Sequence, residues 1–270
     1  MSKRRDPLAN VTRIGIDEVS YRKGHRYLTI VVDHDTGRLL FASPGKDEAT
    51  LDKFFDQLGP EGCARIQLVS VDAAAAFHNV VKKRCPNATL CLDPFHVVQW
   101  ATKALDIVRR AVWNKLRKSG QKKRAKAMKG SRWALWKNYG DLNEAQQATL
   151  AAIERDNKPL FRAYLLKEEL RSIFQEPDPE MAKLTLADWL AWASRSRLPP
   201  FVKLARSIRA HLQAIHDVLD HGLSNARVEA ANTKLRLLTR LAFGFHSPKP
   251  LIALAMLRLG GLCPPLPMRP

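Results

Sequence analysis

The chain has 270 residues, of which 46% are hydrophobic and 26% are charged. That length corresponds to one large domain or two small ones, and the composition is typical of a globular protein, which excludes a disordered or fibrous chain. Lys and Arg number 45 against 26 Asp and Glu, a formal net charge of +19 at pH 7. A surplus this large favours a polyanionic partner such as nucleic acid; a ribosomal-type tail and a solvated basic surface are the alternatives.

The cysteines and the N-terminus indicate the compartment. Cys63, Cys85, Cys91 and Cys263 form no CxxC pair, so we expect reduced thiols and no structural zinc. The first ten residues are basic and lack the apolar stretch of a signal peptide. No run approaches the roughly 18 apolar residues of a membrane-spanning helix. We therefore expect a soluble cytoplasmic protein with no membrane partner.

The first region, about residues 11–100, alternates between β-type and helical patterns. The pattern predicts three strands, over 13–19, 26–33 and 38–42, and then a helix over 47–58 that ends at Gly59-Pro60. A strand over 66–71, a helix over 73–84, a strand over 89–92 and a helix from about 94 follow. This order implies an α/β fold with a mixed five-stranded sheet flanked by helices. It is the order of the ribonuclease H-like fold.

The second region contains no convincing strand, and we expect a large all-α insertion over 101–220. The region from about residue 97 to 220 holds all six tryptophans of the chain. Between Lys103 and Lys137 there are 13 Lys and Arg against one acid, Asp106, which supplies +12 of the net charge. The core would then comprise 11–100 and 221–258, and 259–270 would form a tail.

A helix is predicted after the insertion. Ser224 or Asn225 can cap its N-terminus. An apolar face follows at helical spacing, and an adjacent face carries polar residues. The apolar face comprises Val228, Ala231, Leu235 and Leu238, and the adjacent one Glu229, Asn232, Thr233 and Arg236.

Three acids stand where they could hold metal. Asp17 interrupts an apolar strand, which is costly for a carboxylate unless it is paired or coordinating. Asp72 ends the fourth strand, which lies beside the first in this fold. Two carboxylates so close to each other favour a cation between them. Glu229 can complete the set from its helix. Asp72 could instead be a turn or cap residue, and Glu229 a solvated ion-pair partner; Asp17, with its apolar surroundings, is the hardest of the three to explain structurally.

Five segments together carry a resemblance to a known family. They are Gly15-Ile16-Asp17-Glu18, Val69-Ser70-Val71-Asp72, Asp93-Pro94-Phe95-His96-Val97-Val98, Ser224-Asn225-Ala226-Arg227-Val228-Glu229 and residues 237–247. With them, the chain from about Val11 to Leu259 resembles the catalytic part of insertion-sequence transposases of the ISL-three family, which belong to the DDE group.

The resemblance implies a site and its cofactors. Asp17, Asp72 and Glu229 would be the catalytic and metal-binding triad, holding two Mg²⁺ ions with Mn²⁺ as a substitute. Asp93 and His96 match a D-x-x-H signature, and we expect these two and Asn225 to be structural or substrate-positioning residues. The partners implied are DNA, as element ends and target, and further copies of this chain on DNA at the nucleoid.

The chain departs from the family pattern in three places. Only ten residues precede Val11, so we expect the usual N-terminal zinc-binding and helix-turn-helix module to be absent. Ala226 stands where the family usually has Gly. Residues 73–76 are all Ala, where more polar residues are common.

The basic insertion is expected to contact the DNA backbone. Its tryptophans could stack on an exposed base, although tryptophans at helical spacing more often belong to a core. The residues predicted to bind DNA are Lys103, Arg109, Arg110, Lys115, Arg117, Lys118, Lys122, Lys123 and Arg124, with Arg236 and Arg240 on the helix of Glu229.

Three functions are compatible with these features. The first is a DDE transposase that cleaves DNA and transfers the strand in a metal-dependent reaction. The second is a truncated or domesticated remnant that binds DNA without moving it. The third is a related nuclease or Holliday-junction resolvase. The intact triad favours an enzyme, whereas the absent module favours the remnant.

Overall fold

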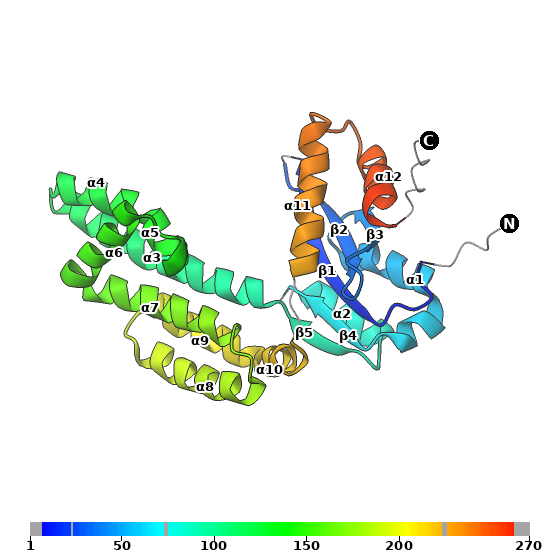
Figure 1. Ribbon diagram of the computed structural model, residues 1–270, viewed down its shortest axis with the longest axis horizontal. Helices are drawn as coiled ribbons and strands as arrows, with labels where there is room; N and C mark the ends of the chain where they lie inside the picture. The colour runs from blue at the N-terminus through cyan, green and yellow to red at the C-terminus, as the bar shows by residue number, and fades with distance from the viewer. Residues whose placement is uncertain (1–6, 23, 73–74, 223–225, 262–270) are drawn as a thin grey trace, which may run out of the picture. The chain divides into compact units, whose positions relative to one another are not determined.

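The computed structural model describes residues 7–22, 24–72, 75–222 and 226–261. The chain divides into two compact units (Figure 1). Unit 1 comprises residues 1–93 and 221–270, and unit 2 comprises residues 94–220. The division after Asp93 places the whole helix that begins at Pro94 in unit 2, including the residues up to 100 that the sequence had suggested for the core.

Unit 1 is built on a five-stranded mixed sheet with the order β3-β2-β1-β4-β5. β1 pairs antiparallel with β2, and β2 with β3, whereas β4 lies parallel to both β1 and β5. The predicted α/β class with a ribonuclease H-like sheet is confirmed. The strands are β1 (Arg13–Arg22), β2 (Arg26–Asp33), β3 (Leu39–Pro44), β4 (Leu68–Val71) and β5 (Thr89–Leu92).

Helices cover both faces of the sheet, and each face has its own core. Ile14 and Ile16 of β1 point to the face covered by α1 (Glu48–Arg65) and α2 (Ala75–Arg84). Because successive strand residues alternate between faces, Gly15, Asp17 and Val19 point to the other face. That face is covered by α11 (Ala226–Leu241) and α12 (Pro248–Leu259), whose apolar residues pack on β1, β2 and β3.

One predicted helix end was wrong. Gly59 leaves the helical region, with φ 73° and ψ 168°, but the chain turns back into helix at Pro60 and α1 ends only at Arg65. The reason is that proline, although it breaks a helix interior, is well tolerated in a first helical turn, where its missing N–H has no partner to lose. Gly59-Pro60 therefore makes a kink.

Unit 2 consists of helices and the turns between them over residues 94–220, all of which the structure describes, with one short 3₁₀ turn at Tyr139–Asp141. Trp189 is fully buried and its indole N–H donates to the Leu166 carbonyl at 2.8 Å, whereas Trp133 is 57% exposed. The helices are α3 (Pro94–Lys118), α4 (Lys122–Gly130), α5 (Arg132–Trp136), α6 (Glu144–Asp156), α7 (Lys158–Ile173), α8 (Pro179–Arg195), α9 (Pro199–Ala210) and α10 (Leu212–His221).

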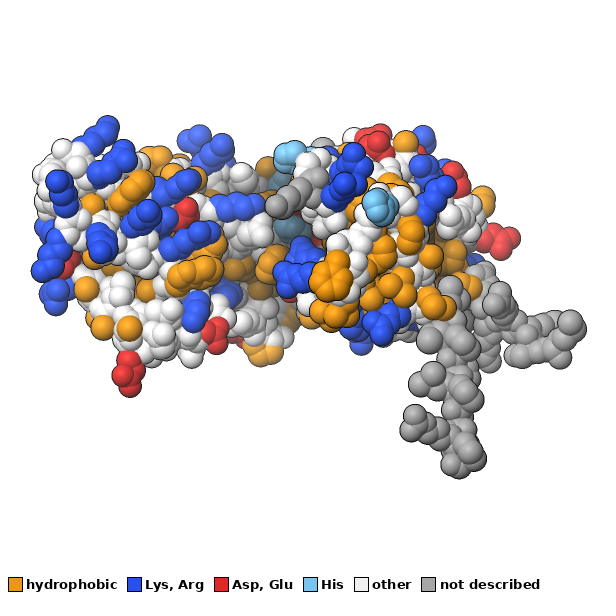
Figure 2. Space-filling model, turned by 90° about the horizontal axis from the view of Figure 1, so that it is seen from above, with side chains coloured by type: hydrophobic (Ala, Val, Ile, Leu, Met, Phe, Trp, Pro, Cys, Tyr) orange, Lys and Arg blue, Asp and Glu red, His pale blue; other side chains and the backbone are white. Residues whose placement is uncertain are grey.

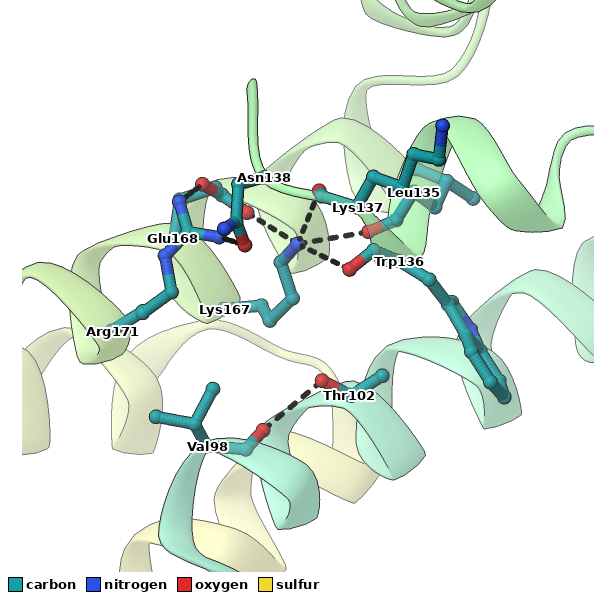
Figure 3. Close-up of polar contacts among 9 residues, drawn as sticks. All are labelled: Val98, Thr102, Leu135, Trp136, Lys137, Asn138, Lys167, Glu168 and Arg171. Atoms are coloured by element: carbon teal, nitrogen blue, oxygen red, sulfur yellow. Dashed lines mark hydrogen bonds and ion pairs between the residues drawn. The ribbon is translucent and has the colours of Figure 1, made fainter. Parts of the chain in front are cut away.

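A buried lysine joins α7 to the end of α5 (Figure 3). The Lys167 Nζ donates to the carbonyl oxygens of Leu135 at 3.0 Å and Lys137 at 3.2 Å, and forms an ion pair with Glu168. The last carbonyls of a helix have no partner within it, so Lys167 caps α5. Burial lowers the pKa of Lys167.

Across the described ranges, every helix is too short or too polar to cross a bilayer. Three cysteines, Cys63, Cys85 and Cys91, are buried, and burial raises the pKa of Cys85 to about 12. Cys263 lies outside the described residues.

Candidate active site

The register of two parallel strands relates Asp17 to Asp72. Arg13, Ile14 and Gly15 of β1 pair with Leu68, Val69 and Ser70 of β4, an offset of 55 positions. The same offset carried two residues further sets Asp17 beside Asp72, the first residue after β4. Neighbouring residues in register share a face and lie about 5 Å apart at the backbone. Both acids therefore belong to the sheet face that α11 covers.

Gly15 allows α11 to lie close to this face. A Cβ atom at position 15 would come within 2.4 Å of the Val228 Cγ2 atom and 2.9 Å of the His34 Nε2 atom. No side chain fits there without displacing α11. Packing thus explains why the Gly-Ile-Asp-Glu segment begins with glycine. Gly15 lies two residues before Asp17 and on the same face of the sheet.

Asn232 of α11 contacts Asp17 directly. Its Nδ2 donates to the Asp17 Oδ2 at 2.5 Å, while the Glu18 backbone N–H donates to the Asp17 Oδ1 at 2.7 Å. Asn232 is only 5% exposed. The sequence placed Asn232 on the polar face of the helix beside Glu229 but assigned it no role in the site; its spacing, three residues after Glu229, was the available signal.

Glu229 lies in the first turn of α11, on the same helical face as Asn232. It is half-buried. Two contacts fix this end of the helix: Val228 packs over Gly15, and the Arg227 guanidinium donates to the His34 carbonyl. The three predicted acids therefore come from β1, the end of β4 and the start of α11, on the face of the sheet that α11 covers.

These residues suit a hard divalent cation in their chemistry. Mg²⁺ and Mn²⁺ take oxygen ligands, carboxylates above all. The Asn232 Oδ1 adds a buried oxygen acceptor for which the described residues provide no hydrogen-bond donor. Within the described ranges, however, no three His, Cys, Asp or Glu side chains lie close enough to form a ready metal cluster. The acids share a face but are not drawn together around one point.

A buried histidine–serine pair lies next to this face. The His34 Nε2 is 2.7 Å from the Ser70 Oγ, and both residues are buried. Burial, reinforced by the positive charges of Arg13 and Arg227, lowers the pKa of His34 to about 4, although Asp35 and Asp33 oppose the shift. His34 is therefore neutral at pH 7 and supports the sheet beneath the N-terminus of α11.

The D-x-x-H residues lie where β5 passes into α3. Asp93 is buried and its backbone N–H donates to the Val71 carbonyl at 3.3 Å, which ties it to the strand before Asp72. His96, in the first turn of α3, is half-buried and meets the Phe95 ring edge-on at 5.8 Å. Asn225 lies outside the described residues.

The basic residues predicted to bind DNA are exposed with one exception. Figure 2 shows Lys and Arg side chains spread over the face of unit 2 in view. Arg109 differs because it is buried and donates to Asp106 and to the Met128 carbonyl, so it serves the packing of α3 on α4. The exposed residues are Lys103, Arg110, Lys115, Arg117, Lys118, Lys122, Lys123 and Arg124 in unit 2, and Arg236 and Arg240 on α11.

Comparison with known proteins identifies the family. The model of the ISL-three (ISL3) family of DDE transposases, described as "Transposase", matches residues 14–255. The chain belongs to this family. The match includes β1 from its second residue, β4, α11 and all of unit 2.

Two named relatives are similar over nearly the whole chain. The transposase for insertion sequence element IS1557 of Mycobacterium tuberculosis is 53% identical over 286 aligned positions, covering 99% of this chain and 64% of the relative. The transposase for insertion sequence element IS1001 of Bordetella parapertussis is 30% identical, covering 91% of this chain and 60% of the relative. The chain thus spans less than two thirds of the length of these relatives.

Proposed function

We propose that this chain is the catalytic part of an insertion-sequence transposase that cleaves DNA and transfers the cut strand. One observation supports the proposal: the β1–β4 register, extended two residues beyond its last observed pair, would set Asp17 beside Asp72 on the sheet face that α11 covers, and Glu229 lies in the first turn of α11. The chain belongs to a DDE transposase family, and the resemblance implies three metal-binding carboxylates, for which these three acids are the candidates.

The proposed chemistry has two steps. Water attacks a phosphodiester at the element end and releases a 3′-hydroxyl; that hydroxyl then attacks a target phosphodiester, so that one bond forms as another breaks. Two Mg²⁺ ions, or Mn²⁺, would activate the attacking oxygen and neutralise charge on the leaving oxygen. Asp17, Asp72 and Glu229 would hold the ions, and no side chain forms a covalent bond to DNA.

The protein's own part is largely positioning. The exposed lysines and arginines of α3 and α4 would bind backbone phosphates irrespective of sequence. Arg236 and Arg240 follow Glu229 on α11 and are exposed, so they can contact phosphates near the acids. The proposed partners are element ends, target DNA and further copies of this chain on DNA at the nucleoid. Light scattering with and without an end duplex would detect the assembly of several copies.

The test removes one carboxylate charge at a time. Asp17→Asn, Asp72→Asn and Glu229→Gln keep side-chain size, and each alone should remove nearly all Mg²⁺- or Mn²⁺-dependent nicking of a supercoiled plasmid, because groups acting as a unit are strongly non-additive. Duplex binding should persist, since it rests on the basic residues. Asp35→Asn is the control, because Asp35 is an exposed acid paired with Arg13.

The outcomes separate the candidate functions. Nicking followed by joining of a 3′-hydroxyl end to target DNA supports the transposase. Nicking without joining would indicate a nuclease or resolvase, and DNA binding without nicking would indicate a remnant. If Asp93→Asn abolished nicking while Asp72→Asn spared it, the second acid would lie on β5 and our assignment to β4 would be wrong.

A further inference from the structure

Asn232 is a buried polar residue with half of its hydrogen-bonding capacity unused. It is 5% exposed, its Nδ2 donates to the Asp17 Oδ2, and the described residues offer its buried Oδ1 no donor. An unsatisfied buried acceptor costs free energy that an apolar side chain of similar size would not. Helix packing alone therefore does not explain an asparagine among Val228, Ala231 and Leu235, which fill the rest of this interface.

The contact fixes the carboxylate of Asp17. One oxygen accepts from the Glu18 backbone N–H at 2.7 Å and the other from the Asn232 amide at 2.5 Å. A donor on each oxygen sets the rotation of the carboxylate plane. Residues that orient a ligand in this way typically change metal affinity about 10–100-fold when they are removed.

We propose that Asn232 is a positioning residue of the site: its amide N–H orients Asp17, which would hold the metal, and its Oδ1 would serve as an acceptor for water bound to that metal. The inference rests on the proposed function, since it requires Asp17 to be a metal ligand. Asn232 also couples α11 to β1, so the helix that carries Glu229 is held to the strand that carries Asp17.

The experiment measures Mn²⁺ binding by the whole chain without DNA, from the rise in Tm with Mn²⁺ concentration. Asn232→Leu removes the donor and the acceptor and keeps the number and branching of the side-chain heavy atoms. It should weaken the apparent Mn²⁺ affinity about 10-fold or more, with little loss of metal-free Tm. Asn232→Asp is nearly isosteric but sets a second negative charge against Asp17. It should lower the metal-free Tm, and Mn²⁺ should restore that Tm, because a cation relieves the repulsion.

Thr239→Val is the matched control on the same helix. Thr239 lies two turns after Asn232, and its hydroxyl donates only within α11, to the Leu235 carbonyl at 3.0 Å. This change should leave the Mn²⁺ response as in the parent. A purely structural role for Asn232 would move the metal-free Tm in its variants and leave the affinity for Mn²⁺ unchanged.

Asp17→Asn separates failure of the inference from failure of the proposed function. If Asp17→Asn abolishes the Mn²⁺ response while Asn232→Leu and Asn232→Asp both keep the parent affinity, the positioning role is overturned and the proposed metal site stands. If Asp17→Asn keeps the parent response, Asp17 is no metal ligand and both are overturned.

Discussion

A glycine at position 15 lets α11 approach β1 closely enough for Asn232 to meet Asp17. A Cβ atom there would overlap Val228 at 2.4 Å and press on His34 and Ser70, which are themselves buried. The glycine thus serves the interface between helix and strand, and the acids on that interface depend on it.

We predict that Gly15→Ala destabilises unit 1 by about 2 kcal/mol, the usual cost of overpacking a tight interface. Denaturant unfolding followed by circular dichroism measures this. Gly130→Ala is the control, because a Cβ at that helical position meets nothing within 4 Å and alanine favours helix. Equal stability of Gly15→Ala and the parent would show that α11 does not pack as described.

His34 makes a second residue-scale prediction, on pH dependence. Its folded pKa is about 4 and its unfolded pKa about 6.5, so between these values the unfolded chain binds more protons. Stability must therefore fall as pH drops below about 6.5, and His34 alone should account for a loss of about 2 kcal/mol at pH 5.

His34→Gln removes the titrating group while retaining a polar contact for Ser70. Its stability should change less than that of the parent between pH 6.5 and 5, as measured by urea unfolding at each pH. Parallel profiles for the two proteins would mean that His34 has the same pKa in the folded and unfolded chains, contrary to its burial.

At the scale of elements, short helices depend on partners from elsewhere in the chain. Helix α5 has only five residues, and its final carbonyls are satisfied by Lys167 of α7. No pattern in residues 132–136 indicates this cap, because the donor lies about thirty positions away in the sequence.

We predict that Lys167→Met destabilises unit 2 by about 3 kcal/mol, because it leaves the end of α5 uncapped and Glu168 without its buried partner. Urea unfolding measures the effect. Lys183→Met is the control: Lys183 pairs with Glu180 and Asp220 at the surface, where ion pairs contribute little. If both variants unfolded like the parent, Lys167 would not be the cap.

At the scale of the whole molecule, the charge distribution leads us to predict that unit 2 is the part of the chain that binds DNA. The net charge of +19 is concentrated in α3 and α4, where eight of the nine predicted phosphate-binding residues of unit 2 are exposed. Each phosphate that a basic side chain neutralises releases counterions, so the plot of log K against log salt should be steep.

Changing Lys115, Lys118, Lys122 and Lys123 together to Gln should flatten this slope by roughly 0.9 for each phosphate that is no longer neutralised, and similarly for all duplex sequences. Fluorescence anisotropy over a salt series gives the slope. The matched control changes four exposed cations of α1 and α2, Lys53, Arg65, Lys82 and Lys83, to Gln, an identical loss of charge. Equal slopes for both variants would show that unit 2 does not hold the DNA.

The sequence alone determined the sheet, because its strands differ in period and composition from the helices between them. Ile14 and Ile16 alternate with Gly15 and Asp17 as strand residues on two faces must, and the apolar spacing of Val228, Ala231, Leu235 and Leu238 marked the buried face of α11. The offset between Asp17 and Asp72 was also visible, although only the pairing of β1 with β4 gives it meaning.

Only the tertiary structure decided which side chains meet. The contact between Asn232 and Asp17 joins positions 215 apart in the sequence. Arg109 is bonded to Asp106 inside unit 2, and Gly59-Pro60 makes a kink where a helix end was predicted. Local patterns record the spacing of apolar residues along one segment, so they determine whether it is a helix or a strand and which of its faces is buried. A buried hydrogen bond depends on two segments packed at atomic distance, and that information lies in neither segment alone.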